Sequence, residues 1–327
     1  MRATVLAALL LAVLAAPAQA DWERYASRTV LDAAMLQPAS DGKFHGEWLL
    51  TGAQLRGALG VIAELEQRPL VPVAATERVS VAGFHRLLLE QLGMSDVAAS
   101  VQATAAAAGL KPPARFGSEV VARLMGLRVN HLAREDRREL YPWQAITRAE
   151  AAWSLAQVYD DPQRDDVARA VLSRFALPVY GAAQRRALAI AVSKIGMPYV
   201  WGGELDHPGW MWGYQANGGY DCSGFAWRVF KLSGLPAGRR IRGRTAAQQA
   251  GEIRKAARLR LAQVAPGDLL FYGRGKFWQR ATERRITHMA IALGNGWMIQ
   301  SSAQGVNIAP LEGPLSRRGF AWARRVL

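Results

Sequence analysis

The sequence has 327 residues, a formal net charge of +15 and a single cysteine. A single cysteine excludes an internal disulfide framework. The chain is longer than one small hydrophobic core usually supports, so we expect two domains. The positive charge favours an anionic partner, and nucleic acid is the first class to consider. Zinc-finger spacings, ribonucleoprotein motifs and basic leucine zippers are absent from the sequence, so no nucleic-acid partner is predicted.

The first twenty residues have the pattern of an export signal. Arg2 precedes an apolar run, Val5 to Ala16, and the small residues of Ala18–Ala20 complete a cleavage pattern. We therefore expect residues 1–20 to be a signal peptide, with no transmembrane segment in the mature chain, because no later stretch reaches about 18 apolar residues. The expected location is outside the cytoplasm, in the periplasm, the cell wall or the medium.

The cationic residues are mostly arginine, which outnumbers lysine about 35 to 6. They gather in runs such as Arg239–Arg244 and Arg254–Arg260. In an exported protein, anionic cell-wall or envelope polymers are the expected counter-charge. A solvated arginine coat without any partner explains the same composition equally well.

Residues 21–161 are predicted to form a mostly helical domain, because their apolar residues recur at helical spacing. The clearest helical segments are Gln54–Glu66, Ala82–Leu92, Gly117–Met125 and Arg148–Tyr159. Polar, turn-forming residues then cluster at 160–166. We therefore expect a linker at 162–181 and a second domain at 182–327.

Three of the helical segments begin in the same way, with a Ser or Thr after an apolar residue. These residues are Thr51, Ser80 and Thr147, and Thr147 with Glu150 predicts a capping box. The string Ile146–Ala152 resembles the second-helix start of S-layer homology modules, which implies that this domain binds cell-wall polymers. A helical bundle that packs on or positions the second domain is the alternative.

The single cysteine, Cys222, precedes an apolar run, Phe225–Ser233, that is long enough for a helix. Asp221 is a suitable N-cap for that helix. The free N–H groups of a first helical turn favour negative charge, so we expect the thiol pKa to be lowered and the sulfur to be nucleophilic. The alternative is an inert, buried free cysteine.

Other motifs surround Asp221-Cys222-Ser223-Gly224 in a fixed order: Gly196–Gly203, Gly243–Gln249, Ala265–Tyr272, Thr287–Gly296 and Met298–Ser302. Over about residues 182–312 this order and spacing resemble the NlpC-type family of bacterial cell-wall cysteine peptidases. The resemblance implies an α+β, papain-like fold in which the cysteine helix packs on a small antiparallel sheet. It implies no cofactor, and no histidine spacing indicates a metal site.

The segment from His288 to Leu293 alternates small and large apolar residues, which predicts a strand with one buried face and one open face. The glycines at 294 and 296 flank Asn295 and predict a hairpin. A three-residue loop would pair Ala290 with Gln300 and place Gln300 on the same face as His288, whereas a two-residue loop would not.

The resemblance assigns roles to these residues. Cys222 is the expected nucleophile, His288 the base and later acid, and Gln300 the residue that orients the imidazole. Tyr199, Asp221 and Ser223 match positions that line the family's pocket for the amine end of the stem peptide. For Asp221 this role competes with, or accompanies, helix capping.

Two insertions depart from the family pattern, at 204–219 and 273–286. We expect them either to rim the cleft or to pack against the N-terminal domain. The predicted function is hydrolysis of peptidoglycan stem peptides at the γ-D-glutamyl-diamino acid bond, through a thioester on Cys222. The alternatives are an N-acetylmuramoyl-L-alanine amidase on the same fold and a non-catalytic wall-binding or scaffold protein.

Overall fold

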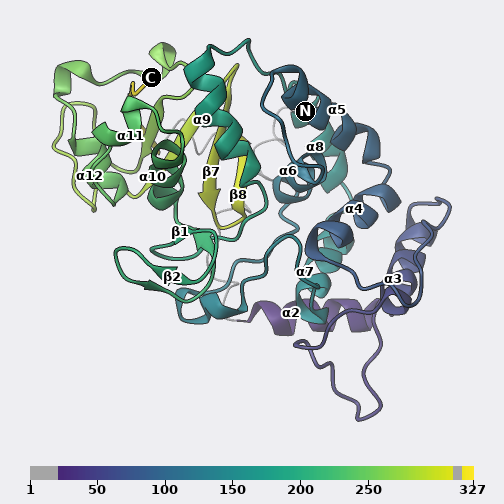
Figure 1. The fold of residues 1–327 in the computed structure, drawn as a ribbon. Coiled ribbons are helices and arrows are strands. Elements are labelled where there is room, and N and C mark those ends of the chain that lie inside the picture. Colours follow the sequence, from purple (N-terminus) through teal and green to yellow (C-terminus); the bar gives the residue numbers. More distant parts are fainter. Residues whose placement is uncertain (1–20, 312–318) are drawn as a thin grey trace.

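The computed structural model describes residues 21–311 and 319–327. The expected signal peptide, residues 1–20, lies outside this range. The chain begins with a helical region, drawn from purple through blue to teal in Figure 1. Its helices are α2 (Trp22–Asp32), α3 (Gly52–Leu65), α4 (Val81–Gln91), α5 (Ser95–Ala107), α6 (Phe116–Leu124), the 3-10 helix η1 (Ala133–Arg138), α7 (Arg148–Asp160) and α8 (Arg164–Leu172).

Three of these helices begin at the predicted capping residues. Thr51, Ser80 and Thr147 each accept a hydrogen bond from the third backbone N–H of their helix. Isolated β-bridges join Leu49 to Thr147, Thr51 to Arg78 and Ser80 to Ala145, so the three helix starts lie side by side. The full capping box predicted at Thr147 is wrong, because the Glu150 carboxylate turns inward and pairs with Arg128.

The C-terminal region contains a five-stranded antiparallel sheet with the order β8-β7-β6-β5-β9. Its strands are β5 (Leu269–Tyr272), β6 (His288–Gly294), β7 (Trp297–Ser302), β8 (Gly305–Pro310) and β9 (Phe320–Arg324). The helices and short strands before it are α9 (Ala182–Ser193), β1 (Glu204–Leu205), β2 (Gly209–Trp210), β3 (Tyr214–Gln215), β4 (Gly219–Tyr220), α10 (Cys222–Leu232), α11 (Pro236–Arg240), α12 (Ala246–Gly251), and the 3-10 helices η2 (Lys255–Ala257) and η3 (Leu261–Gln263).

Helix α10 packs on one face of the sheet, against β6 and β7, and α9 packs beside it (Figure 1). The α+β class, with a cysteine-bearing helix on a small antiparallel sheet behind a helical N-terminal region, is confirmed. Among the described residues, the helices are too short or too polar for any of them to cross a membrane.

The other face of the sheet is covered, and the predicted open face of β6 is wrong. Ala290 and Ala292 are fully buried in a second apolar cluster, which also contains Tyr272 and Met298. Phe320 and Leu261 pack at the margin of this cluster. A row of small residues therefore makes room here for neighbouring side chains, not for solvent.

Arginines on the helical region hold it against the C-terminal region. The fully buried Arg123 side chain donates to the carbonyl oxygens of Gly196, at 2.6 Å, and of Gln304. Arg115 donates to the carbonyls of Ile195, at 3.1 Å, and Ser193, at 3.0 Å. One continuous apolar cluster also contains residues from both regions. The two regions are therefore packed together as one body.

Candidate active site

Cys222 is the first residue of α10, and its position is fixed by a cap. The Asp221 carboxylate accepts a hydrogen bond from the Gly224 N–H at 2.6 Å, and the Asp221 N–H donates to the Gly203 carbonyl at 3.0 Å. The thiol is free and buried, with 8% of the residue exposed. The cap was predictable, because it depends on residues three positions apart.

Burial raises the pKa of the Cys222 thiol to about 12, and the neighbouring Asp221 carboxylate adds to the rise. The backbone N–H groups of Met289 and Ser223 and the Arg244 guanidinium act in the opposite direction. The expected lowering of the pKa is therefore wrong for the resting protein, because the helix N-terminus does not offset the loss of solvent around the sulfur. Cys222 is a thiol at neutral pH, and a nucleophilic role requires a base that takes its proton.

His288 begins β6, and its imidazole contacts Gln300 on β7. The distance from His288 Nε2 to Gln300 Oε1 is 2.7 Å. Gln300 Nε2 in turn donates to Asn307 Oδ1 at 3.3 Å, and the Asn307 amide donates to Ser302 and Gly305. This chain of amides directs the Gln300 oxygen at the imidazole. Nε2 therefore carries the proton and Nδ1 keeps its lone pair.

The hairpin between β6 and β7 explains how Gln300 reaches His288. Ile291 pairs with Ile299 and Ala292 with Met298, which continues to the predicted pairing of Ala290 with Gln300. The turn itself differs from the prediction, because Gly294 pairs with Trp297 across only two residues. Because of a bulge between Ala292 and Gly294, an odd number of residues separates Ala292 from its partner Met298. His288 and Gln300 therefore still lie on one face.

Burial lowers the pKa of His288, while the hydrogen bond to Gln300 and the charge of Asp221 act in the opposite direction. The imidazole is therefore neutral at neutral pH and able to accept a proton. Met289, whose N–H influences the Cys222 thiol, directly follows His288. The Cys222 thiol therefore lies near the start of β6, the strand that begins with His288.

The three predicted substrate-binding residues lie around the start of α10. Ser223 Oγ donates to Asp221 at 3.0 Å. Burial raises the pKa of Tyr199, and the electrostatic influence of Cys222 and Asp221 adds to the rise, so the Tyr199 hydroxyl lies within electrostatic range of both residues. The structure therefore brings Tyr199, Asp221 and Ser223 together at one end of the helix.

Arg244 is a member of this cluster that the sequence did not single out. Its guanidinium donates to both Asp221 carboxylate oxygens, at 3.0 and 2.9 Å, and to Ser223 at 3.0 Å. Its Nε pairs with the buried carboxylate of Glu204 at 2.5 Å. The motif Gly243–Gln249 was visible in the sequence, but nothing local connects it to Asp221. Two carboxylates sharing one guanidinium leave a net negative charge beside Cys222.

Asp136, on η1 of the helical region, also reaches this end of the site. Burial, followed by the charge of Glu139, raises the pKa of Asp136 to about 6. The Trp201 N–H opposes this rise, and the Asp136 charge acts on Tyr199. No local sequence signal marks Asp136, because its place depends on how the two regions pack.

The first insertion, residues 204–219, joins the two regions. The Asn217 amide donates to the carbonyls of Asp136, at 3.1 Å, and Glu139, at 2.5 Å. The Gly218 N–H donates to the Tyr141 hydroxyl at 2.7 Å. Packing against the helical region, one of the two expected arrangements, is therefore confirmed for this insertion. Among the described residues, no group of three or more His, Cys, Asp or Glu side chains is arranged to hold a metal ion.

Comparison with known proteins matches part of the chain to a family. The NlpC/P60 family model matches residues 196–325, so this segment is an NlpC/P60 domain. A bifunctional muramidase/DL-endopeptidase of Bacillus subtilis is 31% identical over 122 residues, which cover 37% of this chain and 30% of that protein. A murein DD-endopeptidase of Escherichia coli is 29% identical over 152 residues, which cover 44% of this chain and 47% of that protein.

A gamma-D-glutamyl-L-lysine dipeptidyl-peptidase of Bacillus cereus is 27% identical over 135 residues, which cover 41% of this chain and 33% of that protein. A crystal structure of an NlpC/P60 family protein from Bacillus cereus is similar with 26% identity and a TM-score of 0.33, covering 47% of this chain and 43% of that one. The chain thus spans less than half the length of each of these relatives.

Proposed function

We propose that this chain, through the NlpC/P60 domain at residues 196–325, is an exported cysteine peptidase that hydrolyses peptidoglycan stem peptides. The proposed bond joins γ-D-glutamate to the following diamino acid. The observations that carry the proposal are the 2.7 Å contact of His288 with Gln300 and the place of Cys222 as the first residue of α10, with its thiol near the Met289 N–H. The names of two relatives, a DL-endopeptidase and a gamma-D-glutamyl-L-lysine dipeptidyl-peptidase, favour this bond.

The reaction follows from the neutral resting pair. His288 Nδ1 takes the thiol proton while the Cys222 sulfur attacks the scissile carbonyl carbon. The carbonyl oxygen becomes an oxyanion, for which the Cys222 backbone N–H is a suitable donor. Collapse of this intermediate breaks the C–N bond, and the imidazolium gives its proton to the leaving amine. A thioester remains on Cys222.

Water completes the cycle by hydrolysing the thioester. His288 takes a proton from the water as it attacks, and then returns a proton to the leaving sulfur. Gln300 accepts from Nε2 throughout, which keeps Nδ1 directed at the reacting atoms. Gln300 is neutral, so it orients the ring without adding the charge stabilisation of a carboxylate.

We further infer that Tyr199, Asp221 and Ser223 bind the amine end of the acyl part of the substrate. The Arg244 guanidinium is shared by Asp221 and Glu204, so the cluster keeps one unneutralised negative charge that suits an ammonium group. Asp136 lies on the same side through its influence on Tyr199. The helical region therefore contributes a carboxylate to the proposed acyl subsite.

The helical region is proposed to position the NlpC/P60 domain. This role is supported by the buried Arg123, which holds the backbone at Gly196 and Gln304. Wall-polymer binding by S-layer-homology-like modules stays a second candidate, because the three capped helix starts lie side by side. Arg148 belongs to the segment that resembles an S-layer homology module, but its guanidinium donates to the carbonyl oxygens of Phe44 and Gln37. It is therefore unsuited to bind a polymer.

The proposal is tested by mass spectrometry of purified muropeptides incubated with the mature chain and with Cys222→Ala. Fragments ending in D-glutamate, absent with the variant, are expected. Glycan freed of its peptide would identify the amidase instead. Products formed equally by the variant would contradict the role of Cys222, and the absence of any product would favour a non-catalytic wall-binding protein.

A further inference from the structure

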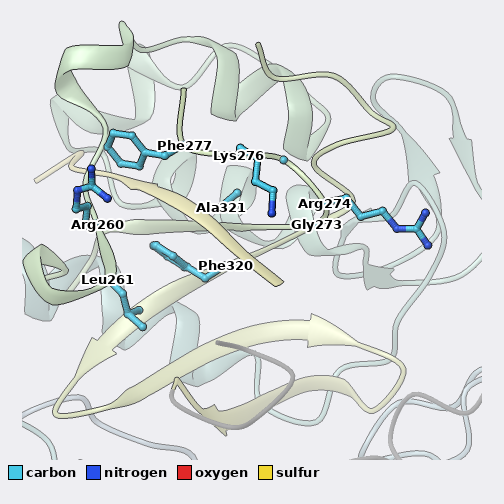
Figure 2. Close-up of a pocket in the computed structure, with 9 residues that line it drawn as sticks. Arg260, Leu261, Gly273, Arg274, Lys276, Phe277, Phe320 and Ala321 are labelled. Atoms are coloured by element: carbon cyan, nitrogen blue, oxygen red, sulfur yellow. The ribbon is translucent and has the colours of Figure 1, made fainter. Parts of the chain in front are cut away.

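A basic cavity of about 460 Å³ lies beside the start of β9 (Figure 2). Its walls come from η3, from the start of β9 and from the second insertion, residues 273–286. The lining residues are Arg260, Leu261, Gly273, Arg274, Gly275, Lys276, Phe277, Phe320 and Ala321. Three are cationic and none is acidic, which favours an anionic ligand.

The register of the sheet fixes where this cavity lies relative to the imidazole. Tyr272 on β5 pairs with His288 on one side and with Phe320 on the other. Directly paired residues of antiparallel strands share a face, so the three side chains form one row. The ring centroids of Tyr272 are 6.0 Å from His288 and 5.9 Å from Phe320. Phe320, which lines the cavity, therefore lies two strands, about 10 Å, from the imidazole.

The cationic groups of the cavity are available to a ligand. Within residues 21–311 and 319–327, neither Lys276 nor Arg260 has a carboxylate partner, and both are exposed. The Arg260 guanidinium lies 4.6 Å from the ring centroid of Phe277. Figure 2 shows Lys276 and Arg260 at opposite ends of the lining, with Phe277 and Phe320 between them, while Arg274 extends away from the other lining side chains. Lys276 and Arg260 therefore flank a partly aromatic space.

The chemistry of the proposed reaction determines which part of the substrate lies in this cavity. His288 protonates the leaving amine, so the leaving segment departs on the imidazole side, opposite the acyl subsite at Asp221. An extended peptide covers about 3.3 to 3.6 Å per residue, so three residues beyond the scissile bond span about 10 Å. That distance matches the row from His288 to Phe320.

We propose that this cavity is a leaving-side subsite that binds the C-terminal carboxylate of an uncrosslinked stem pentapeptide. The Lys276 ammonium pairs with the carboxylate, Arg260 adds positive charge at the other end of the cavity, and Phe277 and Phe320 contact the methyl groups of the terminal alanines. This inference rests on the proposed function. It gives the second insertion a role in substrate choice, because an amidated, crosslinked or shortened stem offers no carboxylate at that distance.

The test compares three synthetic peptides that contain the diamino acid accepted by the protein: the stem pentapeptide, its C-terminal carboxamide and the stem tripeptide. KM and kcat are measured for the mature chain and for Lys276→Gln, Arg260→Gln and the double variant. Arg284→Gln is the matched control, because Arg284 is exposed in the same insertion but does not line the cavity. Thermal unfolding shows that each variant is folded.

For the pentapeptide, the double variant is expected to raise KM roughly tenfold with little change in kcat, as expected for loss of charged hydrogen bonds. The carboxamide should raise KM of the unaltered chain by a similar factor, and the tripeptide should be insensitive to the variants. Equal KM values for the free acid and the carboxamide, or equal effects on the tripeptide, would overturn the subsite while leaving the peptidase intact. If the unaltered chain cleaves none of the peptides, the proposed function fails and the subsite with it.

Discussion

Removing the Gln300 side chain tests how the imidazole is held. In the resting protein, the 2.7 Å contact with His288 Nε2 joins two neutral groups and contributes about 1 kcal/mol. When His288 holds the thiol proton, the same contact becomes a bond from an imidazolium, with a strength of about 1.5 to 3 kcal/mol. Only the difference, about 0.5 to 2 kcal/mol, lowers the barrier. Gln300→Ala should therefore reduce kcat/KM about 2- to 30-fold.

The substitution Gln300→Glu separates orientation from charge. A carboxylate beside His288 favours the imidazolium and raises its pKa, which should move the acid limb of the kcat/KM profile to higher pH. In the unaltered protein, burial lowers the pKa of His288, so that limb should lie below the ordinary histidine range. The assay is release of new amino groups from a defined stem peptide across pH.

The control for both variants is Gln163→Ala, an exposed glutamine far along the chain from the site. It should leave the profile unchanged. The reasoning is refuted if Gln300→Ala keeps kcat/KM within about twofold of the unaltered protein. An acid limb that does not move in Gln300→Glu would equally show that position 300 does not act on the imidazole.

Three further results are expected. The ultraviolet absorbance of a thiolate should be absent at neutral pH, because burial raises the pKa of Cys222 to about 12; a thiolate band lost in Cys222→Ala would contradict this. Asp136→Asn should stabilise the fold near pH 8 by about 1 kcal/mol, a value reduced from the full shift because the residue is only half-buried. The pKa of Asp136 is about 6 in the folded protein and 3.8 in the unfolded chain. The contribution of this carboxyl to stability is therefore fully present below pH 3.8 and is lost as the pH rises through about 6. The stability gain of Asp136→Asn should therefore vanish near pH 4. An equal gain at pH 4 and pH 8 would show that the raised pKa of Asp136 is not its cause. Arg123→Met should destabilise the protein by about 3 kcal/mol in urea unfolding, because it leaves the buried Glu119 with only His85. The exposed control Arg86→Met should lower the free energy of unfolding by under about 0.5 kcal/mol. Equal losses of stability in the two variants would mean that the buried pair contributes no more than an exposed pair.

The parts of the site that were predictable from the sequence depend on short-range rules. Asp221 caps α10 through a contact three residues away. Gln300 reaches His288 because side chains alternate along a strand and the connection has an odd residue count. The exact turn was not predictable, since a two-residue turn with a bulge and a three-residue loop give the same parity.

The parts that were not predictable depend on tertiary packing. The direction of the Cys222 pKa shift follows from how much solvent the fold removes, which a helix N-terminus in a sequence does not reveal. Arg244 reaches Asp221, and Asp136 reaches the neighbourhood of Tyr199, across long stretches of chain. The small residues of β6 indicated an open face, but the chain before β5, together with Leu311 and Phe320, covers them.

The central claim is that the Cys222 sulfur becomes acylated by the substrate. The most direct measurement is mass spectrometry of the protein after acid quenching of a reaction with a stem peptide. The account predicts a thioester adduct of L-alanyl-γ-D-glutamate on the peptide that contains Cys222, absent in Cys222→Ala and accumulating less in His288→Ala. Turnover without any adduct, together with full activity of Cys222→Ala, would contradict it.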